Sequence, residues 1–101
     1  MKRRTTRQIL TALRLLLPTF PEMAYVRKMR RSGLFDRQFY LSTNPGLHPL
    51  CGFFPERHYV QRGERQGLRP NPDFSPQAYL RHNADLTHSV THPLLHYIDF
   101  G

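Results

Sequence analysis

FDRQFYLSTNPGL, residues 35–47, is repeated as FSPQAYLRHNADL, residues 74–86. A second pair of segments follows in the same order, since PERHYVQRG at residues 55–63 returns as PLLHYIDFG at residues 93–101. In both pairs the copies lie about 38 residues apart, a common length for one supersecondary unit of a repeat protein. The chain therefore predicts two copies of one small structural module.

Each copy begins with a sequence typical of a short helix that ends in a turn. Asp36 and Ser75 stand where a helix N-cap is expected, because a short polar side chain there accepts a hydrogen bond from a free backbone N–H of the first turn. NPG at residues 44–46 and NAD at residues 83–85 are turn sequences that end these helices. We therefore expect one helix and then a loop in each copy.

Each copy then continues into a second helix, at residues 55–62 and 93–100. Both helices begin with a proline, whose fixed φ suits the first helical turn. Gly63 and Gly101 follow them and are suited to left-handed C-terminal caps. No run of residues alternates apolar and polar side chains for long enough to predict a strand.

The sequence thus predicts an all-α fold in three parts. Residues 1–31 form a basic helical hairpin, residues 32–72 the first helix-loop-helix repeat with its connector, and residues 73–101 a truncated second repeat. Positions shared by the two copies are expected to be structural, and the two His-Tyr pairs among them are expected to pack between helices. The shared positions are Phe35, Tyr40, Leu41, Asn44, His58, Tyr59 and Gly63 in the first copy and Phe74, Tyr79, Leu80, Asn83, His96, Tyr97 and Gly101 in the second.

The hairpin begins with an amphipathic helix, capped by Thr5 or Thr6 and running to about Leu17. Its apolar residues fall within an arc of about 120° around the helix axis. These residues are Ile9, Leu10, Leu13, Leu16 and Leu17. Arg7 and Arg14 lie at one margin of the arc. Two interpretations stay open: the leucines enter a lipid surface while the arginines reach the headgroups, or the leucines pack on the repeats and the arginines are solvated.

The formal net charge of +8 favours an anionic partner, which lipid headgroups, nucleic acid, an acidic polymer or an acidic protein face would all supply. The cations are concentrated before residue 32, where the only acid is Glu22. They are Lys2, Arg3, Arg4, Arg7, Arg14, Arg27, Lys28, Arg30 and Arg31. We expect these residues to contact the membrane or another anionic partner.

Compartment and chemistry are constrained by the single cysteine, Cys51, which cannot form an intramolecular disulfide and suits a reducing interior. With His48 it supplies two ligands, too few for a zinc site. Arg14 interrupts the apolar run that a signal peptide needs. The longest apolar run is Leu15–Leu17, far short of the roughly 18 residues that a membrane-spanning helix needs.

No constellation of side chains predicts catalysis. His88, His92 and His96 have the spacing of metal ligands on a helix, but the helix predicted to begin one residue after His92 separates them. The acids of the repeats, Glu64 among them, are expected as caps, in loops or on exposed turns, so they form neither a triad nor a carboxylate pair. We therefore expect no enzymatic activity, no metal site and no cofactor.

The repeated positions also carry a family resemblance. They read SGLFD at 32–36, YL at 40–41, NP at 44–45 and HYV at 58–60, followed by Gly63, Gly67, Pro70, Pro72 and Phe74. This pattern resembles the bacterial tandem repeats that precede glycosyltransferase domains in proteins of surface-polysaccharide synthesis, including those labelled rhamnan-synthesis or O-antigen glycosyltransferases. The resemblance covers residues 32–101 and implies helical repeats without catalytic residues of their own. The chain departs from the pattern at residues 46–50 and at Ala84, which indicates different loops there.

The resemblance implies a non-catalytic helical interaction module that works in bacterial envelope-polysaccharide synthesis. Its partner would be a glycosyltransferase or another envelope-assembly component, and the basic hairpin adds contact with an anionic membrane surface. The expected location is the cytoplasm, at the inner face of the cytoplasmic membrane. The alternative is a small basic nucleic-acid-binding protein, which the charge permits although no helix-turn-helix or RNA-binding signature is present.

Overall fold

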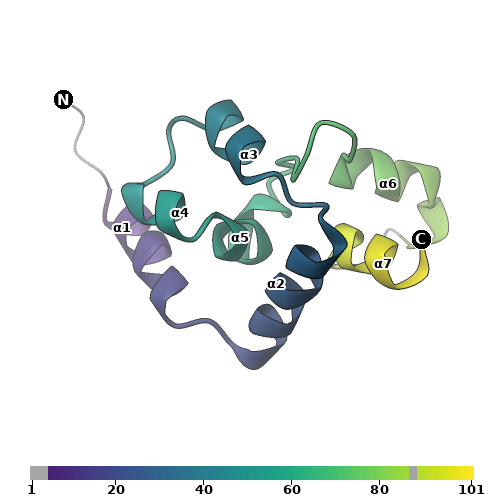
Figure 1. Ribbon diagram of the computed structural model, residues 1–101, viewed down its shortest axis with the longest axis horizontal. Coiled ribbons are helices and arrows are strands. Elements are labelled where there is room, and N and C mark those ends of the chain that lie inside the picture. The colour runs from purple at the N-terminus through teal and green to yellow at the C-terminus, as the bar shows by residue number, and fades with distance from the viewer. Residues whose placement is uncertain (1–4, 87–88) are drawn as a thin grey trace.

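The computed structural model describes residues 5–86 and 89–101, and this part of the chain is all-α, as the sequence predicts (Figure 1). Its α-helices are α1 (Thr6–Leu13), α2 (Phe20–Ser32), α3 (Arg37–Thr43), α4 (Pro49–Phe53), α5 (Pro55–His58), α6 (Pro76–His82) and α7 (Pro93–Phe100). Two 3-10 helices, η1 (Arg14–Leu16) and η3 (Ala84–Leu86), and a π-helical segment, η2 (Tyr59–Gly63), complete the order. The described residues contain no strand, only an isolated bridge between Asn71 and Phe74.

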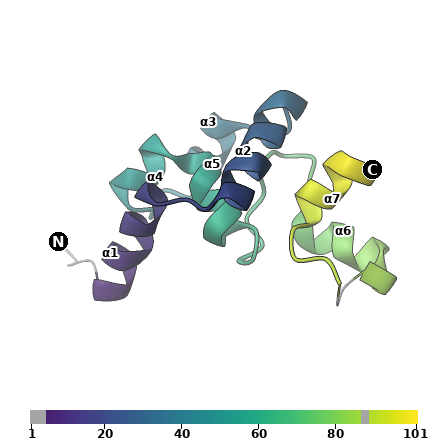
Figure 2. The ribbon, with the colours of Figure 1, turned by 90° about the horizontal axis from the view of Figure 1, so that it is seen from below.

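The core lies where α2, α5 with η2, and α7 pack against one another near the middle of the molecule (Figures 1 and 2). Its buried residues are Tyr25, Val26, Met29, Tyr40, Tyr59, Val60 and Leu94. Beyond this centre, α1 packs near α4 at one end and α6 pairs with α7 at the other, along a body of 43 × 26 × 26 Å. The hairpin at residues 5–32 therefore contributes to the core through its second helix.

Both helices of the hairpin begin with a reciprocal cap. The Thr5 hydroxyl accepts from the Gln8 N–H at 3.1 Å while the Gln8 side chain accepts from the Thr5 N–H at 2.9 Å. Thr19 and Glu22 repeat this arrangement at the start of α2. Because such boxes satisfy two free donors at once, they fix where each helix begins. Gly33 then ends α2 in the left-handed conformation, with φ of 71°.

The repeat segments are capped as their sequences predict. The Asp36 carboxylate accepts from the Phe39 N–H at 2.9 Å, and the Ser75 hydroxyl accepts from the Ala78 N–H at 3.2 Å. Asn44, at the other end of α3, donates from its side chain to the Tyr40 carbonyl at 2.8 Å. In each segment, local polar residues alone set the helix ends.

The tyrosine and histidine shared by the two copies form the same contact in each. The Tyr40 hydroxyl lies 2.6 Å from His58 Nδ1, and the Tyr79 hydroxyl lies 2.7 Å from His96 Nδ1. His58 and Tyr40 are buried, whereas His96 and Tyr79 are half-buried. In each copy the histidine thus contacts a tyrosine of the preceding repeat helix, whereas Tyr97, the other member of the second His-Tyr pair, is 38% exposed.

Gly63 does not form the left-handed cap expected for it, because α5 continues into the π-helical segment and Glu64 follows with φ of −61°. In the described residues, only Gly33 and Gly67 have positive φ, so Gly101 is not left-handed either. A Cβ on Gly63 would lie 2.1 Å from the Tyr40 hydroxyl oxygen. The close approach of a buried tyrosine therefore requires glycine at position 63, whereas the backbone conformation there does not.

Gly63→Ala is expected to lower the free energy of unfolding by about 1–3 kcal/mol, because Tyr40 is buried, bonded to His58 and unable to move away. Gly52→Ala is the matched control, since a Cβ on this α4 residue meets nothing within 4 Å. Removing glycine from a helix should stabilise that variant by about 0.5–1 kcal/mol. Urea titrations followed by circular dichroism measure both changes. Equal effects at the two positions would refute the packing argument.

A helix that the sequence did not predict, α4, occupies the segment expected to be a loop. His48 Nδ1 accepts from the Leu50 N–H at 3.1 Å, and Pro49 takes the first helical position. The side chain of Arg37 donates to the Gly52 carbonyl at 2.9 Å at the end of the helix. Histidine is an uncommon N-cap, so the usual residue signals for a helix start did not mark this one.

Candidate functional site

Seven large apolar side chains of the N-terminal hairpin are exposed. We call this set the apolar face, and it consists of Ile9, Leu10, Leu13, Leu16, Leu17, Phe20 and Met23. Leu17 is 77% exposed and Phe20 is 87% exposed. The interpretation in which the leucines pack on the repeats is therefore wrong.

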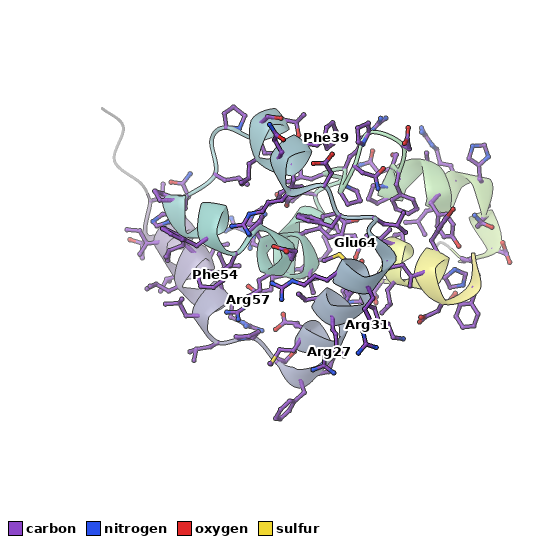
Figure 3. The ribbon with its side chains drawn as sticks, in the orientation of Figure 1. Arg27, Arg31, Phe39, Phe54, Arg57 and Glu64 are labelled. Carbon is purple, nitrogen blue, oxygen red and sulfur yellow. The ribbon has the colours of Figure 1, made fainter. Side chains whose placement is uncertain are left out.

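The hairpin packs inward through a different side of α1 and η1. Ala12 and Leu15 are buried there, each only 1% exposed. The Leu15 carbonyl accepts from Arg57 Nη1 at 3.0 Å, and the Arg57 guanidinium lies 4.5 Å from the centre of the Phe54 ring (Figure 3). The Gln61 side chain donates to the Arg14 carbonyl at 3.3 Å. These contacts turn the leucine arc away from the body.

The two arms of the hairpin meet at an angle. Residues 6–16 and 20–32 are bent by 76°, and they form a V along one edge of the molecule (Figure 1). In the described part of the chain, no single helix is long and apolar enough to cross a membrane. Only this bent pair, taken together, reaches that length and composition.

Most of the cations predicted to meet an anionic partner are exposed on the same hairpin. Lys2, Arg3 and Arg4 lie outside the described residues. The other six are all exposed: Arg7, Arg14, Arg27, Lys28, Arg30 and Arg31. Arg27 and Arg31 project outward from α2 (Figure 3).

Half of the six exposed cations pair with a carboxylate. Arg14 binds Glu22 at 2.9 Å, Lys28 lies 3.0 Å from Asp99, and Arg30 lies 3.3 Å from Glu56. Within residues 5–86 and 89–101, no ion pair forms at Arg7, Arg27 or Arg31. Burial of Glu22 opposes its ionisation, but hydrogen bonds from Thr19 and Arg14 outweigh this and lower its pKa. The hairpin's one acid is therefore neutralised, and the surface keeps a positive excess.

The most polar buried feature is Glu64, which the sequence placed on an exposed turn and which proves to be inside. Its Oε2 accepts from the Tyr25 hydroxyl at 2.7 Å, the Tyr59 hydroxyl at 3.2 Å and the Leu94 N–H at 2.9 Å. His92 Nδ1 lies 3.0 Å from Oε1. The Glu64 side chain is 1% exposed and sits between α2 and α7 (Figure 3). One carboxylate thus joins the hairpin to residues of both sequence copies.

The electrostatics around Glu64 keep its hydrogen bonds to Tyr25 and Tyr59 in place. Burial, reinforced by the charge of Glu64, raises the pKa of Tyr25 and of Tyr59 well above the usual value. Both hydroxyls therefore stay protonated and keep donating to the carboxylate.

The histidines that invited a metal interpretation do not come together. His92 faces Glu64, His96 faces Tyr79, and His48 caps α4. His88 lies outside the described residues. No group of three or more His, Cys, Asp or Glu side chains in the described chain is arranged to hold a metal ion.

The two tyrosines that bind Glu64 lie in segments of similar sequence, a similarity distinct from that between the two repeat copies described above. PEMAYV at residues 21–26 is similar to PERHYV at residues 55–60, and each segment places a tyrosine four residues after a proline near the helix start. The two tyrosines are the two that meet at Glu64. Seven residues after each of these prolines comes a basic residue, Lys28 or Arg62, and twelve residues after each comes a glycine, Gly33 or Gly67. These two are the glycines with positive φ in the described part of the chain.

No protein-family model, no curated protein and no solved structure matches this chain.

Proposed function

We propose that this chain is a non-enzymatic helical module that docks on an anionic membrane surface through the apolar face of its hairpin. The observation that carries the proposal is the exposure of seven large apolar side chains between Ile9 and Met23, with the exposed cations Arg7 and Arg27 on either side of this segment and Arg14 within it. Exposed apolar patches of this kind in soluble domains mark interaction sites. Cations at the border favour an anionic lipid surface as the occupant.

The energetics support a reversible surface contact. Burying a leucine side chain fully is worth about 1.5–3 kcal/mol, and the side chains of the apolar face are already half to mostly exposed. Each Lys or Arg close to an anionic membrane adds about 1 kcal/mol. Neither arm spans a bilayer alone, so the hairpin would lie in the interface.

The family resemblance supports a cellular process and a location for this docking. We infer that residues 32–72 and 73–101 are two copies of a helix-loop-helix repeat, because the Tyr-His contact recurs between matching positions. Their resemblance to repeats next to glycosyltransferases supports a role in bacterial envelope-polysaccharide synthesis, with such a transferase or another assembly component as protein partner. The module would then work at the inner face of the cytoplasmic membrane.

The double variant Leu13→Ala and Leu17→Ala tests the docking surface. Both residues are exposed, so the fold should be kept while apolar area for lipid contact is lost. Partition onto vesicles of phosphatidylcholine and phosphatidylglycerol is expected to weaken about tenfold or more, which corresponds to at least about 1.4 kcal/mol. Vesicle co-sedimentation measures it.

Phe100→Ala is the matched control, since this side chain is 78% exposed but lies on α7, at the other end of the molecule. Its partition should equal that of the unchanged chain. Equal loss in both variants, or no vesicle binding by the unchanged chain, would refute membrane docking. Duplex DNA binding that is tighter than non-specific levels and unaffected by the leucine changes would favour the nucleic-acid alternative.

A further inference from the structure

An arginine-lined groove lies beside the apolar face. Arg7 of α1, Arg62 of η2 and Arg65 of the following turn line one cavity of 270 Å³ together with Gln66. Two adjoining cavities, of 210 Å³ and 470 Å³, are also lined by Arg62. The fold therefore gathers guanidinium groups from segments far apart in the sequence, which local sequence could not indicate.

These cations are poorly neutralised by the protein itself. In the described residues, neither Arg7 nor Arg62 forms an ion pair, and Arg65 donates to the backbone carbonyl of Gln61. The one carboxylate on the adjoining 470 Å³ cavity belongs to Glu22, which Arg14 already binds at 2.9 Å. Like charges held together without an acid favour an external anion.

The neighbouring histidine supports this picture of the groove. His58 lines the 210 Å³ cavity with Arg7 and Arg62, and its burial, aided by the charge of Arg62, lowers its pKa. Histidine is therefore neutral there and leaves the positive charge to the arginines. Guanidinium groups form paired hydrogen bonds with phosphate oxygens, so several of them around one cavity suit a dianionic phosphate.

We propose that this groove binds a dianionic phosphate group and that the group is the phosphomonoester headgroup of an anionic lipid. The choice of a lipid rests on the proposed membrane docking. Leu10, a member of the apolar face, lines the 470 Å³ cavity beside Arg62 and Arg65. A headgroup in the groove would therefore leave its acyl chains next to the leucines.

The phosphate site is tested first in the absence of membranes. Inorganic pyrophosphate is titrated into the full chain at constant ionic strength and followed by two-dimensional NMR. Shifts are expected at the backbone amides of residues 62–66, and Arg62→Gln with Arg65→Gln should weaken binding about tenfold or more. Arg27→Gln with Arg31→Gln is the control, because it removes two charges from exposed α2 positions that line none of the three cavities shared by Arg62. Absence of binding, or equal weakening in both double variants, overturns the site.

The lipid source is tested second, with phosphatidylcholine vesicles that carry phosphatidic acid or phosphatidylglycerol at equal surface charge. The unchanged chain is expected to prefer phosphatidic acid by about tenfold, and the Arg62→Gln and Arg65→Gln changes should abolish only this preference. Pyrophosphate binding without a preference for phosphatidic acid overturns the lipid headgroup and leaves a site for a free phosphate. Vesicle binding without pyrophosphate binding overturns the phosphate site and leaves the docking surface intact.

Discussion

Glu64→Ala is expected to lower the free energy of unfolding by about 3–5 kcal/mol, a large part of the stability of a small domain. Among the described residues, Glu64 is the only acceptor for the Tyr25 and Tyr59 hydroxyls, so the change leaves both without a partner, and it also removes the acceptor of the Leu94 N–H. Each buried donor left without a partner costs about 1–3 kcal/mol. Urea titration followed by circular dichroism measures the loss.

Asp99→Ala is the matched control for Glu64→Ala. Asp99 also accepts from a partner distant in sequence, Lys28, but this pair is partly exposed and should be worth less than about 1 kcal/mol. Glu64→Gln keeps the shape and one acceptor oxygen, so its loss should fall between the two alanine variants. A Glu64→Ala chain as stable as Asp99→Ala would show that the cluster does not hold the helices together.

A second large effect is expected in acid, because burial, aided by the charge of Arg62, lowers the pKa of His58 from 6.5 to about 4. The unfolded chain then binds a proton at this histidine at higher pH than the folded chain does. The contribution to stability is complete above pH 6.5 and is lost as the pH falls towards 4. The loss over this window is expected to be about 3 kcal/mol.

His58→Gln isolates this effect, since glutamine cannot take up the proton. The variant will be less stable at neutral pH because the Tyr40 contact changes, but its stability should fall less steeply between pH 6.5 and 4. His82→Gln, at an exposed position of α6, is the control for replacing a histidine as such. Stability curves measured by urea titration that stay parallel for the His58→Gln chain and the unchanged chain would contradict the assignment.

Helix starts were the part of the fold that the sequence predicted best. Asp36, Ser75 and Thr5 cap the helices that follow them, because a cap depends on residues three positions apart and on little else. The helices predicted to begin at Pro55 and Pro93 do begin there, because this signal too is local. His48 shows the limit, since a residue that seldom caps a helix does so in α4.

Features set by contacts between distant segments were not predicted. The leucine arc of α1 is more apolar than the side that packs, yet the small Ala12 lets the helix approach the body and Leu10 stays outside. Nothing in the sequence around Glu64 distinguishes it from an exposed acidic residue. Its burial depends on hydrogen-bond donors from α2 and α7, which are distant in sequence. The groove at Arg62 likewise needs α1 folded against η2, and no local pattern records that.

The bend between the two arms of the hairpin has a geometrical consequence. One helix on a flat surface defines a line and can roll about its own axis, whereas two helices crossing at 76° define a plane. A body docked through both arms keeps a single rotational freedom, about the normal to the surface. The tilt of α6 and α7 and their height above that surface would then be set by the hairpin.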